Sequence, residues 1–197
     1  MKNNYAIFLD VDGVINSLQH LYTSGNLNFD AKTTPYQAGN YTIWVPDYMP
    51  ELIQAIERSS DLYWLTTWRQ AANEYISEQI LGISSNTPVI DDGTARRAPD
   101  WKFDACRELA VQLSEDGKKV LWIEDFGRHY DTTLYGHLTY VDTDHNEDGV
   151  LLPQHLPTDF MEHLITNGNY NGPTYVAPPR ANRKVDIYQR NFGVPTS

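Results

Sequence analysis

Three short apolar segments, each followed directly by acidic or hydroxyl side chains, constrain the fold of this chain more than any other feature. They span residues 5–9, 62–65 and 120–123. Each is apolar without alternation, as expected of strands that are buried on both faces of a sheet. Segments with helical spacing separate them, at 46–60, 69–81 and 101–115. This order predicts an α/β fold of three layers, with a mostly parallel, Rossmann-like sheet between helices.

Weaker elements surround this core. Further strands are expected at 88–90 and 139–141, and a last helix at 158–167. In the segment 69–81, the helical spacing places Tyr75 and Ile76 on the inner face and Gly82 at the end. The polar residues 16–45 follow the first strand as a flap, a small hairpin or a cap over the site. We expect one domain over 1–167, and an extended or partly disordered tail over 168–197.

Composition limits the classes of function. The formal net charge of -11 argues against tight, non-specific binding of a polyanion, because such binding needs many Lys and Arg contacts. The longest apolar runs are far shorter than the roughly 20 residues of a membrane span. The N-terminus lacks the pattern of a signal peptide, and the single Cys106 cannot form an internal disulfide. We therefore expect a cytoplasmic protein with no membrane contact and no stable protein partner.

The strongest chemical signal is Asp10-Val11-Asp12-Gly13, directly after the first strand. Two like charges this close repel, and they stay ionised at low cost only when a cation or strong donors sit between them. A hard divalent ion such as Mg²⁺ suits an all-oxygen site of this kind. Gly13 would let the backbone turn tightly without a Cβ. In isolation, the same pattern is also typical of an ordinary turn.

Polar side chains also follow the two later strands, at the edge where ligands bind in a parallel sheet. Thr66 and Thr67 follow the second strand, where a helix N-terminus could hold a phosphate oxygen. Thr67 could equally be the N-cap of that helix. Glu124 and Asp125 form a second acidic pair after the third strand. Lys102 lies near the start of a helix, where its positive charge opposes the helix dipole. We therefore expect something other than helix stability to hold a lysine at this position.

Taken in order, these residues resemble the four signature motifs of the haloacid dehalogenase superfamily, with Asp10-x-Asp12-Gly13, Thr66, Lys102 and Glu124-Asp125. Two further segments are similar to the haloacid-dehalogenase domain associated with RNA-repair proteins. They are Thr66-Thr67-Trp68-x-x-x-Ala72-Asn73 and Asp142-x-Asp144 followed by Gly149-Val150. The resemblance covers residues 5 to about 165. It departs from the common pattern in the fourth motif, where Glu124 stands in place of an Asp.

The resemblance implies a Mg²⁺-dependent phosphatase with a haloacid-dehalogenase-like fold. It implies that Asp10 attacks phosphorus and forms an aspartyl-phosphate, and that Asp12 serves first as general acid and then as general base. Thr66 would bind a phosphoryl oxygen. Lys102 would neutralise both the phosphoryl group and the Asp10 carboxylate.

The same resemblance implies a metal site and a substrate class. Mg²⁺ would be held by Asp10, by Asp12 through its backbone carbonyl, and by Glu124 or Asp125. Candidate substrate-binding residues are Gly13, Asn16, Thr67, Arg69 and Asn73. A nucleotide or the phosphorylated end of a nucleic acid is the leading substrate, whose bases could stack on Trp44, Trp68 or Trp101 if these rings do not simply pack. A phosphatase of small sugar phosphates and a catalytically inactive binding protein are the alternatives.

Overall fold

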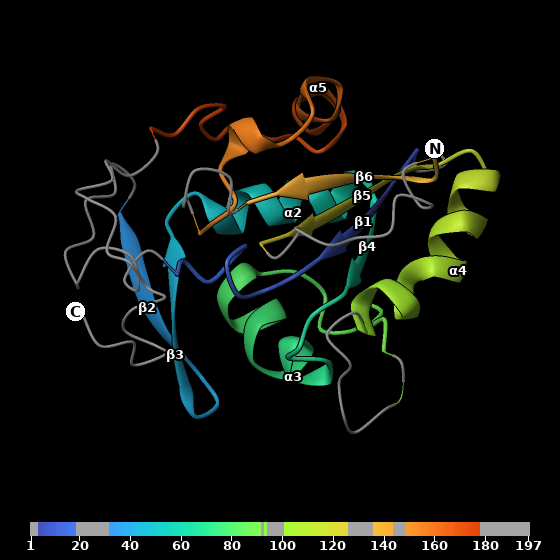
Figure 1. Ribbon diagram of the computed structural model, residues 1–197. Coiled ribbons are helices and arrows are strands. Elements are labelled where there is room, and N and C mark those ends of the chain that lie inside the picture. The colour runs from blue at the N-terminus through green and yellow to red at the C-terminus, as the bar shows by residue number, and fades with distance from the viewer. Residues whose placement is uncertain are drawn as a thin grey trace, which may run out of the picture.

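A four-stranded sheet forms the centre of the molecule (Figure 1). The computed structural model describes residues 4–18, 32–91, 93, 101–125, 136–143 and 149–177. The strands are β1 (Tyr5–Leu9), β4 (Asp61–Trp64), β5 (Lys119–Glu124) and β6 (Leu138–Asp142), in the order β4-β1-β5-β6. Every neighbouring pair is parallel. The carboxyl ends of all four strands therefore meet at one edge of the sheet.

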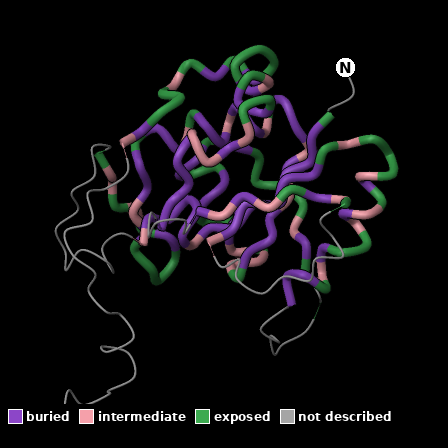
Figure 2. Tube along the Cα trace, turned by 45° about the horizontal axis from the view of Figure 1, so that its top comes forward, coloured by how far each residue is buried: buried purple, intermediate pink, exposed green. Residues whose placement is uncertain are grey.

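Helices cover both faces of this sheet. The helices are α2 (Met49–Ser59), α4 (Trp101–Glu115) and α5 (Thr158–Asn167). Residues of β1 alternate between two cores: Ile7 and Leu9 pack with α2 and α5, whereas Phe8 packs with α4. Figure 2 shows the buried residues concentrated along the central strands. Burial on both faces explains why the strand segments are continuously apolar, and the predicted parallel sheet between helices is confirmed.

A β-hairpin follows β1 and lies on the other side of the molecule from α4 (Figure 1). It consists of β2 (Thr33–Ala38) and β3 (Tyr41–Pro46), which pair in antiparallel register. Gly39, with a φ of +58°, forms the two-residue turn together with Asn40. Of the three forms expected for residues 16–45, the part that the structure describes from residue 32 onwards is a hairpin.

The segment after β4 winds differently from the prediction. It consists of the short helix α3 (Gln70–Ala72) and the π-helix η1 (Asn73–Leu81), which ends at Gly82 with a φ of +68°. The helical segment and its glycine stop are confirmed. The wider winding of a π-helix changes which side chains face inward. Ile76 is buried as predicted, but the prediction for Tyr75 is wrong, since its side chain is 37% exposed.

The remaining described segments complete the packing. Val89 forms an isolated bridge with Trp64 and extends the sheet edge where a weak strand was expected. The short helix η4 (Pro153–His155) precedes α5, and beyond α5 the residues Tyr170 and Val176 are buried against the domain. The last part of the predicted tail, 178–197, lies outside the described residues. The longest described helix, α4, has 15 residues, and no described helix could cross a membrane.

Candidate functional site

Three carboxylates gather at the carboxyl edge of the sheet, between β1 and β5. Asp10 follows β1 directly, Glu124 is the last residue of β5, and Asp125 comes next. The parallel register pairs Leu9 with Ile123, and the Asp10 N–H donates to the Ile123 carbonyl at 3.2 Å. The residues that follow the two strands are thereby placed side by side. One oxygen of each of the three carboxylates lies within 4.8 Å of the others.

Lys102 reaches the same cluster from the first turn of α4. Its Nζ donates to Oδ2 of Asp10 at 2.6 Å and to Oε2 of Glu124 at 2.5 Å. Burial acts to lower the pKa of Lys102, but the two carboxylates outweigh burial and the pKa is raised. Burial, together with the charge of Asp10, raises the pKa of Glu124 well above its usual range, although Lys102 opposes this. The Glu124 carboxyl therefore ionises less readily than one in water.

The charge and chemistry of this cluster suit a metal ion. Three carboxylates minus one ammonium give a formal charge of -2. Asp10 and Glu124 are both buried, and uncompensated charge is costly away from water. A divalent cation would balance it, and an all-oxygen donor set is the one that hard cations prefer. Asp10, Glu124 and Asp125 could therefore hold a metal ion, whereas its expected identity as Mg²⁺ stays a prediction.

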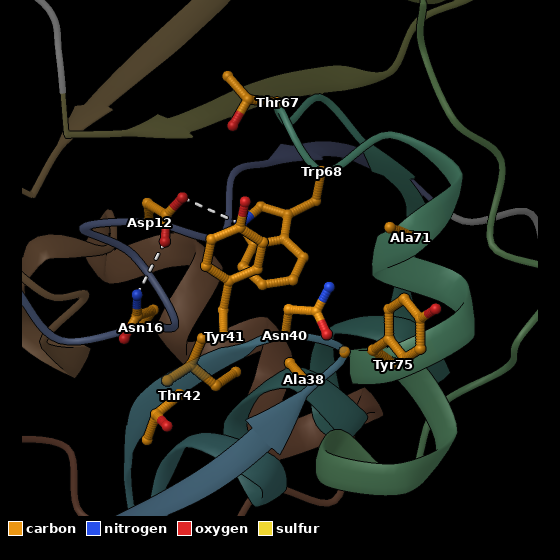
Figure 3. A pocket seen from close by; sticks show the side chains of 12 residues that line it. Asp12, Asn16, Ala38, Asn40, Tyr41, Thr42, Thr67, Trp68, Ala71 and Tyr75 are labelled. Atoms are coloured by element: carbon orange, nitrogen blue, oxygen red, sulfur yellow. Dashed lines mark hydrogen bonds between the residues drawn. The ribbon is translucent and has the colours of Figure 1, made fainter.

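The side chain of Asp12 lies outside this cluster and points towards Asn16 and Trp68 (Figure 3). Its carboxylate accepts hydrogen bonds from Nδ2 of Asn16 at 2.8 Å and from Nε1 of Trp68 at 2.9 Å. Asn16 Oδ1 in turn accepts from the N–H of Trp44 in β3 at 2.9 Å. Two donors from different elements therefore fix the Asp12 carboxylate, and Asn16 links its loop to the hairpin.

Gly13 occupies a position that only glycine suits. Its φ is +72°, and a Cβ built there would clash with the Asp125 carboxylate. The predicted role of Gly13 in a tight turn is therefore confirmed, and the turn also brings the first loop against the second acidic pair. The Thr143 hydroxyl donates to the Gly13 carbonyl at 2.7 Å and ties the turn to the end of β6. Thr143 was not identified from the sequence.

The two threonines after β4 have different surroundings. Thr66 is fully buried beyond the strand that pairs with β1, and its hydroxyl accepts from the Trp68 N–H at 3.2 Å. Thr67 is exposed and lines a pocket. It is not the N-cap of the following helix, because Arg69 holds that position and no side chain caps it. The structure thus places Thr66 two residues beyond β4, the strand that pairs with β1, and Thr67 in the pocket wall.

Arg69 and Asn73 make contacts that hold the α3–η1 segment in place. Arg69 has a φ of +49°, and its Nε lies 3.3 Å from Oδ2 of Asp91. Asn73 is buried, where its Oδ1 accepts from Nε1 of Trp64 at 3.1 Å and its Nδ2 donates to the Thr87 carbonyl at 2.8 Å. Neither residue lines the pocket. The substrate-binding role expected for Asn73 and Arg69 stays a prediction.

A pocket of about 590 Å³ opens beside Asp12, between the hairpin and the segment that carries Thr67 (Figure 3). Its lining includes three aromatic side chains, Tyr41, Trp68 and Tyr75. Of the three tryptophans considered as stacking residues, the structure places Trp68 in this lining, but not Trp44 or Trp101. Tyr41 and Tyr75 were not identified as site residues, because their positions depend on the hairpin and on the π-helix.

Comparison with protein-family models, with curated proteins and with solved structures gives no match for this chain. This protein is therefore described from its own fold and candidate site. The chain is an α/β protein with a parallel sheet. At the carboxyl edge of that sheet it carries a buried lysine and an acidic cluster that could hold a metal ion.

Proposed function

We propose that this protein is a Mg²⁺-dependent phosphomonoester hydrolase of the haloacid dehalogenase type, with Asp10 as its nucleophile. The observation that carries the proposal is the convergence of Asp10, Lys102 and the pair Glu124-Asp125 at one buried place. Asp10 and Lys102 are 92 residues apart in the sequence. A buried excess of negative charge is costly to a fold. Well-packed apolar residues of similar volume would stabilise the fold equally well or better. A protein that only binds partners would have no physical need of this charge.

The acidic cluster would hold the metal ion. Asp10 contributes one oxygen, and its neighbours Glu124 and Asp125 are both close enough to contribute another. The backbone carbonyl of Asp12 completes the set that the resemblance implies. Mg²⁺ bound there would neutralise negative charge on the phosphoryl oxygens, which is a main requirement of phosphoryl transfer.

The side chains of this chain divide the reaction between them. A carboxylate oxygen of Asp10 forms a bond to phosphorus while the bond to the leaving oxygen breaks, and Asp12 gives its proton to that oxygen. Asp12 then takes a proton from water, whose oxygen attacks phosphorus and releases inorganic phosphate from Asp10. Lys102 offsets the charge of Asp10 and of the phosphoryl group. Thr66, whose hydroxyl accepts from Trp68, can donate its own proton to a phosphoryl oxygen.

Hydrolysis of p-nitrophenyl phosphate tests this proposal, with Mg²⁺ and with a chelator. Asp10→Asn keeps the size of the side chain but removes the nucleophile, so activity should fall by at least about a thousandfold. Chelation should abolish activity, and added Mg²⁺ should restore it. Asp116→Asn is the matched control, because Asp116 is exposed beyond the far end of α4. Activity that survives both Asp10→Asn and chelation would belong to a contaminant, and the chain would then be a binding protein.

A further inference from the structure

The pocket beside Asp12 differs in chemistry from the acidic cluster. Its aromatic side chains come from two walls, with Tyr41 on the hairpin and Trp68 and Tyr75 on the opposite segment (Figure 3). Four large hydrophobic side chains are exposed among the described residues, and two of them are Tyr41, at 68%, and Tyr75, at 37%. Exposed apolar surface gathered around a cavity is typical of a binding site.

The aromatic rings are held in place by the surrounding structure. The ring centroids of Tyr41 and Trp68 are 5.6 Å apart, with the planes inclined at 69°. The Trp68 indole is fixed by its hydrogen bond to Asp12. Tyr75 packs against the hairpin turn, since a Cβ on Gly39 would lie 3.3 Å from its ring. Asp12 thus marks one end of the aromatic pocket and the hairpin turn the other, and about 590 Å³ is enough for a small planar ligand.

The charge of the lining limits what this ligand can be. Asp12 is the only charged residue in the lining that the structure describes. A second phosphate would find no Lys or Arg there and would approach a carboxylate. The uncharged amide of Asn40 and the hydroxyls of Thr42 and Thr67 also line the pocket, and these groups can hydrogen-bond to a sugar or to the edge of a base. This lining therefore suits a planar group that carries no negative charge and has hydrogen-bonding atoms.

We propose that this pocket binds the nucleoside of a nucleoside monophosphate, with the base against Tyr41 and Trp68. The inference rests on the proposed function for the position of the phosphate, which would lie at Asp10. It narrows the substrate class to mononucleotides, in preference to the phosphorylated ends of polynucleotides and to sugar phosphates without a base.

The Tyr41→Ala variant tests the stacking surface. We expect kcat/KM for adenosine and uridine monophosphates to fall about tenfold, the usual effect of losing one stacked base. The kcat/KM for ribose 5-phosphate should stay unchanged, because that substrate carries no base. Tyr41→Trp keeps an aromatic ring and should keep the preference for nucleoside monophosphates over ribose 5-phosphate. Tyr175→Ala is the matched control, since Tyr175 is 66% exposed but does not line the pocket.

Three kinetic outcomes would contradict this inference, in its nucleoside pocket or in its restriction to mononucleotides, while leaving the phosphatase proposal intact. The first is equal kcat/KM for ribose 5-phosphate and nucleoside monophosphates in the unaltered protein. The second is an equal loss on both substrates in Tyr41→Ala. The third is turnover of a 3'-phosphorylated oligonucleotide as fast as that of a mononucleotide, which would overturn the restriction to mononucleotides.

Binding of adenosine and uridine, measured by equilibrium dialysis, separates this inference from the proposed function. The experiment needs no catalysis, because neither nucleoside carries a phosphate. Suppose that no phosphate ester is hydrolysed but a nucleoside binds, and that Tyr41→Ala weakens its binding about tenfold. The proposed function then fails and the nucleoside pocket stands. If no phosphate ester is hydrolysed and no nucleoside binds, both proposals are overturned.

Discussion

At the scale of single residues, Asp10 and Asp12 lie two positions apart but enter different surroundings. Asp10 is buried, contacts Lys102, and belongs to the acidic cluster. Asp12 is bound by Asn16 and Trp68 at the edge of the aromatic pocket. The turn thus places Asp10 in the acidic cluster and Asp12 at the pocket, and under the proposed function these are the sides of the cation and of the leaving group. Two carboxylates in separate environments are what a nucleophile and a distinct proton donor require.

Replacing Gly13 tests its contact with Asp125, because Gly117 offers a control that has backbone strain but no such contact. Both Gly13 and Gly117 have a positive φ, of 72° and 83°, but a Cβ at Gly117 would meet nothing within 4 Å. Gly117→Ala should therefore lower the free energy of unfolding by about 1 kcal/mol, from backbone strain alone. Gly13→Ala should lower it further and should reduce phosphatase activity, because the new Cβ displaces the Asp125 carboxylate. Urea unfolding and p-nitrophenyl phosphate hydrolysis measure the two effects, and equal losses in both variants would contradict the steric argument.

At the scale of elements, hydrogen bonds join the hairpin to the loop after β1. Asn16 joins Asp12 to the Trp44 N–H, and the Ser17 N–H donates to the Trp44 carbonyl at 2.7 Å. Because Asn16 bonds to both, the position of the hairpin and that of the Asp12 carboxylate are linked. The pocket lies between the hairpin and the α3–η1 segment, so the same contact also sets its width.

Asn16→Ala should destabilise the protein and lower its activity together. The Trp44 N–H would lose its partner in a partly buried place, which should lower the free energy of unfolding by about 1 kcal/mol. The Asp12 carboxylate would lose one of two donors, so we expect a lower kcat for p-nitrophenyl phosphate. Gln37→Ala is the control, because its hydrogen bond to the Gly39 carbonyl lies on an exposed part of the hairpin. An unchanged kcat in Asn16→Ala would show that Asn16 does not position Asp12.

The sequence predicted elements well where the apolar pattern was clear. β1, α4 and α5 have the expected bounds, and the parallel sheet explains why residues after separate strands meet. The turn after Thr66 was not predictable, because Arg69 adopts a positive φ that its residue type does not indicate. The helix therefore starts too late for Thr67 to cap it. The bond from Trp68 to Asp12 was also missed, since sequence spacing does not define side-chain direction in a turn.

At the scale of the whole molecule, local and global charge must be distinguished. The chain carries a formal net charge of -11, so any added salt screens repulsion across the surface. The acidic cluster carries a formal charge of -2 in a largely buried place, where screening is weak. A cation that binds there should therefore stabilise the protein in a way that ionic strength cannot reproduce.

Thermal unfolding with and without Mg²⁺ tests this distinction. At a free Mg²⁺ concentration of a hundred times Kd, binding to the folded state alone should add about 2.7 kcal/mol to the free energy of unfolding. The midpoint should rise accordingly and should return to its starting value with a chelator. Asp125→Asn removes one carboxylate of the cluster and should reduce the shift, whereas Asp116→Asn should leave it unchanged. If NaCl at matched ionic strength raised the midpoint as far as Mg²⁺ does, the cluster would not be a metal site. If Asp125→Asn kept the full shift, Asp125 would not be the ligand.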